Sequence, residues 1–184
     1  MQPFSPKEAA VRLVFVDTET TGLSPRLGDR IVELACVEMR DGQLTGNEFY
    51  RLINPQQPIP PAVSDIHGIH DAMLQDKPVF AAIATELIDF VGFDSVVMHC
   101  APFDTSFFGA EFARAEMSCP ALADREQVID TLPRFRARHP EERCVLQALC
   151  ERYGVELPTD ERWHGALIDA RMLARLWQAA GLSV

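Results

Sequence analysis

The segment 11–23 reads VRLVFVDTETTGL, and it decides the fold of this chain. Residues 11–16 form a short apolar run rich in β-branched and aromatic side chains, which predicts a buried strand. Because side chains two apart in a strand share a face, Asp17 and Glu19 should project side by side where the strand ends. Neighbouring carboxylates repel each other unless a cation lies between them, and oxygen ligands favour a hard divalent cation. Gly22 then allows a turn or the close approach of a ligand. The segment therefore predicts a strand that ends in a metal site.

The composition predicts one globular domain over residues 1–184. With 184 residues and 47% hydrophobic content the chain can bury a sizeable core, and no repeat or long linker divides it. No apolar run approaches the roughly 20 residues that a membrane helix needs. No basic and apolar leader opens the sequence, and the five cysteines include no C-x-x-C pair. These features predict a cytoplasmic protein with reduced thiols and no membrane contact.

The charge of the chain limits how it could bind nucleic acid. A net charge of -10 argues weakly against a protein that grips nucleic acid by bulk electrostatics. Bound divalent cations reverse the local field, however, so this charge is compatible with a protein that binds phosphate through metal ions.

The residues after the first strand predict an antiparallel meander. Ile31 to Met39 and Leu44 to Ile53 read as two further strands, and Asp41-Gly42 between them is a strong hairpin signal. Residues 54–61 are rich in proline and cannot continue a hydrogen-bonded ladder, so they should form a connection.

The rest of the chain alternates between helical patterns and short strands. Helices are expected from Phe80 to Val91, over 103–117, from Leu146 to Tyr153 and from about Ala166 to Ala180. Short strands are expected at Ser95 to Met98 and at Gln127 to Ile129. The pattern predicts an α/β fold: a mixed five-stranded sheet, with an antiparallel N-terminal meander plus parallel strands, flanked by helices.

Two further carboxylates follow elements that can bring them to the first strand. Asp104 comes after the strand at 95–98, where ligand groups concentrate, although it could also cap the helix that follows. Asp169 lies in the first turn of the last helix, where the helix dipole tolerates negative charge. His164 lies five residues before Asp169. At that spacing the two residues would not lie on the same face of a helix, so His164 should belong to the loop before the helix. Beside a metal-bound carboxylate it would suit a general base, and otherwise it is an ordinary surface histidine near Trp163.

The ordered set of these residues is more specific than any of its parts. An Asp-x-Glu at a strand end, an Asp after a later strand and a His-x-x-x-x-Asp at the last helix rarely occur together by chance. With this set the chain resembles the DEDDh family of 3′→5′ exonucleases, most of all the proofreading epsilon subunits of bacterial DNA polymerase III. The resemblance covers nearly the whole chain. Its further motifs are Ile66-His67-Gly68-Ile69, Asp76-Lys77-Pro78, Leu149-Cys150-Glu151-Arg152-Tyr153 and His164-Gly165-Ala166-Leu167-Ile168-Asp169-Ala170.

The resemblance implies a ribonuclease H-like fold in which four acids hold two divalent cations, Mg²⁺ or Mn²⁺. Carried over residue by residue, the four acids are Asp17, Glu19, Asp104 and Asp169, and the general base is His164. It also implies a pocket for the terminal nucleotide, formed by Thr20, Thr21, Gly22, Leu23, Ile66, His67, His99 and Phe103. From the residues alone, His67 either contacts substrate or satisfies a loop. The implied reaction releases nucleoside 5′-monophosphates from single-stranded or frayed 3′ ends of DNA.

The chain departs from the family pattern at two positions. Cys100 stands where relatives usually carry Asn, and Ala62 stands where the proofreading subunits commonly place a carboxylate that helps to hold the terminal sugar. Neither change touches an implied metal ligand, but both leave open the choice between DNA and RNA, as in an RNA-trimming exonuclease similar to ribonuclease T. We see no polymerase-binding tether before Val184, so a DNA polymerase partner also stays open. The alternative from another class is an inactive scaffold that binds nucleic acid or a polymerase.

Overall fold

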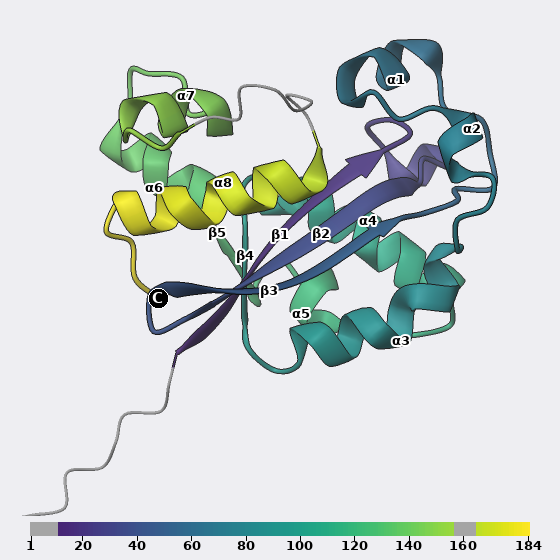
Figure 1. The fold of residues 1–184 in the computed structure, drawn as a ribbon, viewed down its shortest axis with the longest axis horizontal. Coiled ribbons are helices and arrows are strands. Elements are labelled where there is room, and N and C mark those ends of the chain that lie inside the picture. Colours follow the sequence, from purple (N-terminus) through teal and green to yellow (C-terminus); the bar gives the residue numbers. More distant parts are fainter. Residues whose placement is uncertain (1–10, 157–164) are drawn as a thin grey trace, which may run out of the picture.

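A mixed five-stranded sheet forms the centre of the molecule (Figure 1). The computed structural model describes residues 11–156 and 165–184. The strands are β1 (Arg12–Thr20), β2 (Ile31–Arg40), β3 (Gln43–Leu52), β4 (Ser95–Met98) and β5 (Val128–Asp130). They lie in the order β3-β2-β1-β4-β5; β1 is antiparallel to β2, which is antiparallel to β3, whereas β4 is parallel to β1 and to β5. The sheet confirms the predicted meander followed by parallel strands.

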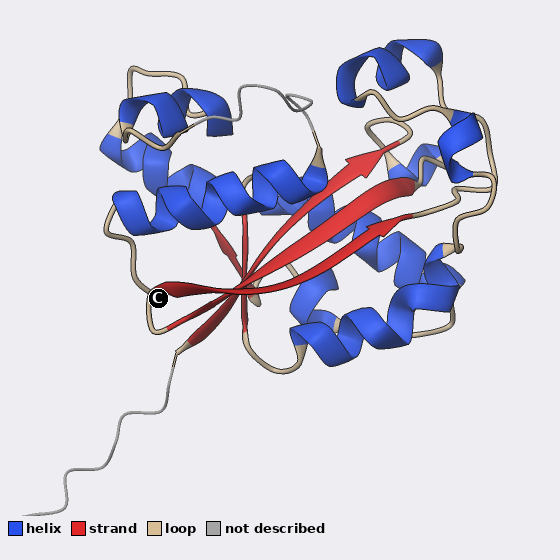
Figure 2. Ribbon diagram, viewed as in Figure 1, coloured by secondary structure: helices blue, strands red, loops and turns tan. Residues whose placement is uncertain are grey.

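Helices cover both faces of this sheet (Figure 2). They are α1 (Pro61–His67), α2 (Asp71–Leu74), α3 (Phe80–Val91), α4 (Ala101–Arg114), α5 (Pro120–Ala123), α6 (Thr131–Arg138), α7 (Leu146–Arg152) and α8 (Ala166–Ala179), with a short 3-10 helix η1 (Pro25–Leu27). The apolar stripe of α8 packs on one face, and α3, α4 and α5 pack on the other. Within the described ranges, none of these helices has the length and apolar character to cross a membrane.

The alternation of side chains along β1 decides what lies on each face. Leu13 and Phe15 point toward α8 and join its core cluster. Val14 and Val16 point to the opposite face, where they join the core formed with α3 and α4. The same period of two, continued along the strand, places both acids of the Asp-Thr-Glu sequence on the α8 face. It places the threonine between them on the α4 face.

The bounds of the predicted elements differ from the structure only at their ends. Helix α3 spans the predicted residues Phe80–Val91. Strand β1 continues through the acidic segment to Thr20, because this end of the strand stays paired with β2. Helix α4 begins at Ala101, two residues before the prediction, and Pro102 fits there because the first helical N–H groups need no helical acceptor.

Four short helices, α1, α2, α5 and α6, are absent from the sequence-based prediction. Three of them carry a proline in the first turn, at Pro61, Pro120 and Pro133. Proline breaks a helix interior but is tolerated in the first turn, so the proline-rich pattern concealed these helices. In α6 the start is fixed by Asp130, whose side chain accepts a hydrogen bond from the Leu132 N–H.

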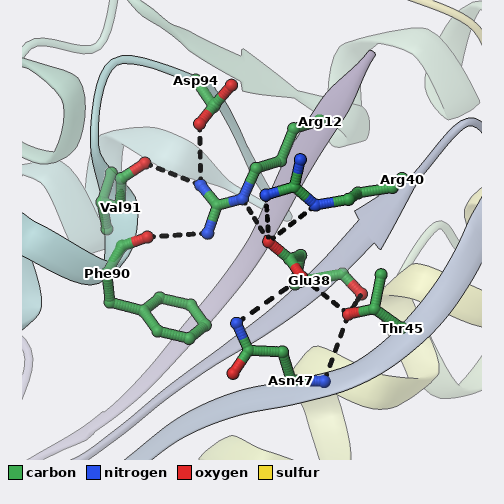
Figure 3. Close-up of polar contacts among 8 residues, drawn as sticks. All are labelled: Arg12, Glu38, Arg40, Thr45, Asn47, Phe90, Val91 and Asp94. Carbon is green, nitrogen blue, oxygen red and sulfur yellow. Dashed lines mark hydrogen bonds and ion pairs between the residues drawn. The ribbon is translucent and has the colours of Figure 1, made fainter. Parts of the chain in front are cut away.

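Arg12 at the start of β1 ties the sheet to the end of α3 (Figure 3). Its guanidinium pairs with Glu38 on β2 and, at 2.9 Å, with Asp94 in the loop after α3. It also donates to the carbonyl oxygens of Phe90 and Val91 in the last turn of α3, at 2.7 and 2.9 Å. Burial alone would raise the pKa of Glu38, but hydrogen bonds, the first of them from Arg12, lower it to about 2. The network therefore links the start of β1, the end of the strand that is far from Asp17 and Glu19, to β2 and α3.

Replacing Arg12 by Met should lower the free energy of unfolding by about 3–5 kcal/mol, because Glu38 would stay buried without its main cation. The side chains of Arg12 and Glu38 are 9% and 6% exposed. Arg40 also pairs with Glu38 but is 53% exposed, so Arg40→Met should cost less than about 1 kcal/mol. Urea unfolding measures both losses, and equal losses would contradict the assignment of Arg12. Because the folded pKa of Glu38 is depressed, the Arg12→Met deficit should shrink as the pH falls through about 4 toward 2.

Candidate metal centre

Three carboxylates converge where the end of β1 meets the first turn of α8. Asp17 and Glu19 project from β1 on the α8 face, and Asp169 lies in the first turn of α8. One carboxylate oxygen from each residue lies within 4.8 Å of the other two, and all three residues are half-buried. An ion with ligand distances of about 2.1 Å can contact oxygens this close together with little rearrangement. The donor set could therefore hold a divalent cation.

Asp104, the fourth predicted ligand, approaches the end of β1 from the other face of the sheet. It lies in the first turn of α4 and is buried, and its Oδ1 accepts a hydrogen bond from the Thr18 hydroxyl at 2.7 Å. Thr18 stands between Asp17 and Glu19, so this bond fixes Asp104 to the same strand end. The structure thus brings three predicted ligands together and places the fourth beside them.

The three aspartates at this centre have raised pKa values when no cation is present. Loss of hydration, and then the charges of Asp169, Asp104, Glu19 and Glu33, raise the pKa of Asp17 well above its usual range. Burial raises the pKa of Asp104 to about 7, and burial followed by the charge of Glu33 raises that of Asp169 to about 7. Ionised carboxylates held this close repel one another, and a divalent cation relieves the repulsion. The electrostatics therefore fit a hard cation.

A fifth carboxylate, that of Glu33 on β2, adjoins the centre, and the sequence analysis missed it. Glu33 pairs in register with Glu19 across the β1–β2 ladder and is buried. Its Oε1 accepts a hydrogen bond from the Tyr50 hydroxyl at 2.6 Å, and its Oε2 accepts one from the Ala166 N–H at 2.8 Å. The only available signal was that Glu33 is one of two acids inside the largely apolar predicted strand from Ile31 to Met39.

The segment after β1 forms a tight turn that is held by its own polar groups. The Thr20 hydroxyl donates to the Gly22 carbonyl at 2.6 Å, and the Thr21 hydroxyl oxygen accepts from the Arg30 N–H at 3.0 Å. A Cβ on Gly22 would lie 2.4 Å from the Asp29 carboxylate. Any other residue at this position would therefore clash with Asp29 unless the Asp29 side chain moved. These contacts give the turn a defined shape beside the acids.

Apolar side chains are exposed at the same end of the sheet as the acids. Leu23, just after the turn, is 86% exposed, and Ile66 on α1 is 61% exposed. Leu27 on η1 is also 86% exposed, and the sequence analysis did not single it out. Phe103 is half-buried and packs against Phe107 with ring centroids 4.9 Å apart. Figure 1 shows α1 on the side of the molecule where β1 ends, and Leu23 follows that strand end in the chain.

The histidines predicted for the site have different surroundings. His67 is buried at the end of α1, and its Nδ1 accepts the backbone N–H two residues further on at 3.1 Å. The Nε2 of His99 donates to the Cys144 carbonyl at 2.8 Å, and its Nδ1 lies 2.8 Å from the Thr131 hydroxyl oxygen. Burial lowers the pKa of His99. Both ring nitrogens of His99 therefore have partners within the protein. His164 lies outside the described residues.

Both departures from the family pattern lie at the start of a helix. Cys100 is exposed before α4 with a φ of 73°, a left-handed conformation that Asn adopts more readily than most residues. Its backbone N–H donates to Asp130 Oδ1 at 3.0 Å, which holds the residue in place. Ala62 is exposed in the first turn of α1.

Comparison with known proteins identifies the family of this fold and centre. Residues 14–177 match the model of the exonuclease family. The chain belongs to this family. DNA polymerase III subunit epsilon of Rickettsia felis is 38% identical over 169 residues, which cover 92% of this chain and 73% of that protein. The corresponding Escherichia coli subunit is 36% identical over 175 residues, or 93% and 72% of the two chains.

Solved exonuclease structures share the architecture of this family member. Exonuclease X in complex with 5′ overhanging duplex DNA has a TM-score of 0.65 and 27% identity, over 93% of this chain and 94% of that chain. Exonuclease I of E. coli in complex with a dA16 oligonucleotide has a TM-score of 0.76 and 21% identity, over 92% and 40% of the two chains. These likenesses confirm the predicted ribonuclease H-like fold class.

The affinity of this exonuclease for Mn²⁺ should fall as the pH drops below 7. Asp169 has a pKa of about 7 without metal, so the cation must displace a proton from it at lower pH. A proton displaced from Asp169 alone makes the affinity about tenfold weaker at pH 6 than at pH 8, and protons displaced from Asp17 and Asp104 add to this difference. The free energy of unfolding of the metal-free protein should change in the opposite direction. Because folding raises the pKa of these carboxyl groups, the metal-free protein should lose stability as the pH rises from about 4 through 7. Calorimetry in buffers of different ionisation enthalpy measures the affinity and the proton release; a pH-independent affinity would contradict the raised pKa.

Proposed function

We propose that this chain is a metal-dependent 3′→5′ exonuclease that releases nucleoside 5′-monophosphates from single-stranded or frayed 3′ ends of DNA. The observation that carries the proposal is the convergence of Asp17, Glu19 and Asp169 oxygens within 4.8 Å in a member of the exonuclease family. The similarity to DNA polymerase III epsilon subunits over 92–93% of the chain supports DNA as the substrate and the 3′ end as the point of attack.

The proposed cofactors are two divalent cations, Mg²⁺ or Mn²⁺. Asp17, Glu19 and Asp169 would hold them, and Asp104 would contribute from its position beside Thr18. Bound cations of this kind supply charge neutralisation at the phosphate, a water of lowered pKa and stabilisation of the leaving oxygen. The centre then attracts a phosphate without a basic surface, so the net charge of -10 is compatible with a nucleic-acid substrate.

His164 is the proposed general base. An imidazole with a pKa of about 6.5 is largely neutral at working pH and can take the proton of the attacking water. The water oxygen bonds to phosphorus as the bond to the 3′ oxygen of the preceding nucleotide breaks. The terminal nucleotide thereby leaves as its 5′-monophosphate.

The terminal nucleotide would bind against the turn after β1 and the exposed apolar side chains near it. Leu23 and Ile66 are exposed enough to pack against bases, and Phe103 lies at the start of the helix that carries Asp104. Thr20, Thr21 and Gly22 of the turn, and His67 at the end of α1, would complete this pocket. Packing of apolar side chains on bases is tolerant of sequence, as an exonuclease needs.

We further propose that residues 1–184 form a single exonuclease domain that acts in the cytoplasm beside a DNA polymerase. The family match over 14–177 supports the single domain. The polymerase subunits among the relatives support the partner and the compartment.

Digestion of 5′-labelled oligonucleotides tests the proposed function. With Mg²⁺ or Mn²⁺, single-stranded DNA should shorten stepwise from its 3′ end and release nucleoside 5′-monophosphates, and EDTA should stop the reaction. A DNA and an RNA oligonucleotide of the same sequence should be compared under identical conditions. A strong preference for RNA would replace the proposal by an RNA-trimming enzyme, and absence of both cleavage and Mn²⁺ binding would favour an inactive scaffold.

A further inference from the structure

Helix α8 carries Asp169 but has no capping side chain of its own. Its N-cap residue is Gly165, and no side chain at that position accepts a hydrogen bond from the first turn. The first N–H groups of a helix have no acceptor within the helix, and a partly buried helix start without a partner is costly. The required acceptor must therefore come from elsewhere in the fold.

Glu33 supplies this acceptor from the neighbouring strand. Its Oε2 accepts the N–H of Ala166, the first residue of α8, at 2.8 Å, although the two residues are 133 positions apart in the chain. Its Oε1 accepts the Tyr50 hydroxyl of β3 at 2.6 Å, so both oxygens of the carboxylate are fixed. Glu33 is 3% exposed and stands opposite Glu19 in the β1–β2 register. One side chain thus links the strand pair at the metal centre to the start of the helix that brings Asp169.

We infer that Glu33 is a positioning residue for the metal centre: it fixes the start of α8 against β2 and thereby holds Asp169 at the right distance from Asp17 and Glu19. The inference rests on the proposed function. The negative charge of Glu33 is unfavourable for the neighbouring acids, since it opposes their ionisation. At this buried position the start of α8 and the Tyr50 hydroxyl each donate a hydrogen bond to the Glu33 side chain.

Two variants test separately whether the length or the charge of the Glu33 side chain matters for the metal centre. Glu33→Gln loses the charge, but its amide oxygen can still accept the Ala166 N–H while its amide nitrogen donates to the Tyr50 hydroxyl oxygen. Glu33→Asp keeps the charge, but it is one methylene shorter and cannot reach both Ala166 and Tyr50. If positioning is the role of Glu33, the variant that keeps the charge should be the damaged one.

Calorimetric titration with Mn²⁺ and single-turnover kinetics on a 5′-labelled DNA oligonucleotide measure the effect. Loss of a residue that orients metal ligands typically costs 10- to 100-fold in affinity or rate, so we expect Glu33→Asp to weaken Mn²⁺ binding and slow cleavage by about tenfold or more. Glu33→Gln should stay within about threefold of the wild type in both quantities. KM for the oligonucleotide should change little in either variant, because Glu33 is buried and does not face the substrate.

The control for a merely structural effect is Arg12→Met, which weakens the fold at the other end of β1 and should leave Mn²⁺ affinity unchanged. Equal losses in Glu33→Asp and Arg12→Met, or wild-type binding in Glu33→Asp, would overturn the inference. A tenfold loss in Glu33→Gln would also overturn it, and this measurement decides the matter alone if Glu33→Asp does not fold. If the wild type itself binds no Mn²⁺, the proposed function fails instead, so the two failures are distinguishable.

Discussion

Asp17→Asn is expected to abolish exonuclease turnover and, at the same time, to raise the melting temperature of the metal-free protein. The loss of turnover follows from the place of Asp17 in the acidic cluster, where oxygens of Asp17, Glu19 and Asp169 all lie within 4.8 Å of one another. Removing a charged ligand from a metal centre withdraws several kcal/mol of transition-state stabilisation, which corresponds to a rate at least about 10³-fold lower.

The gain in stability follows from the environment of Asp17. Burial first, and then the charges of four neighbouring carboxylates, raise its pKa well above the usual range. A carboxyl group whose pKa is raised on folding destabilises the folded state at a pH above its ordinary value, because it must either stay protonated or ionise among like charges. Asparagine removes this penalty and keeps nearly the same shape. The metal-free variant should therefore melt higher than the metal-free wild type at pH 8.

Thermal unfolding at pH 8, with and without Mn²⁺, measures both parts of this prediction. The wild type should gain stability on addition of Mn²⁺, since a ligand that binds only the folded state stabilises it by mass action. The Asp17→Asn variant should have a higher melting temperature than the wild type without Mn²⁺, and its melting temperature should rise little when Mn²⁺ is added. The matched control is Asp89→Asn on the exposed face of α3, which makes the same change of net charge and should alter neither quantity. A variant that melts lower than the wild type, or that keeps its turnover, would contradict the role of Asp17.

The parts of this centre that the sequence predicts depend on local periodicity. The alternation of β1 places Asp17 and Glu19 on one face, whatever the rest of the chain does. Asp169 follows from its position in the first turn of α8, next to residues of the apolar stripe that packs on the sheet. In both cases the spacing within one element fixes where the side chain points, and the structure brings these three acids together.

The parts that the sequence does not predict depend on contacts between distant elements. Glu33 acts through Ala166, 133 residues away, and no pattern within β2 indicates that partner. The family resemblance implies His99 for the nucleotide pocket, but it does not indicate that the ring contacts Thr131 and Cys144, which are 32 and 45 residues away. The contacts of His99 exist only once the start of α6 and the loop before α7 lie against the end of β4. Register and packing, rather than local spacing, decide them.

His164→Ala should lower turnover by about 10²- to 10⁴-fold while leaving Mn²⁺ affinity within about threefold, because a general base contributes to the reaction without holding the cation. His164 lies outside the described residues, so the prediction rests on its place in the sequence, five residues before Asp169. Two kinds of group in the wild type can produce a rate that rises with pH. The carboxyl groups of Asp104 and Asp169 have pKa values of about 7 without metal, and a histidine base titrates near about 6.5.

Saturating Mn²⁺ separates these two causes. A bound cation keeps its carboxylate ligands ionised, so under saturation the remaining rise of the wild-type rate between pH 5.5 and 7.5 reports the base. His164→Ala should lose this rise and show a rate nearly independent of pH over the same interval. His70→Ala is the matched control, because His70 is exposed before α2 and should leave the profile of the wild type unchanged. If the rise persists in His164→Ala, another group is the base. If Mn²⁺ affinity collapses instead, His164 is a metal ligand, and the proton of the attacking water must go elsewhere.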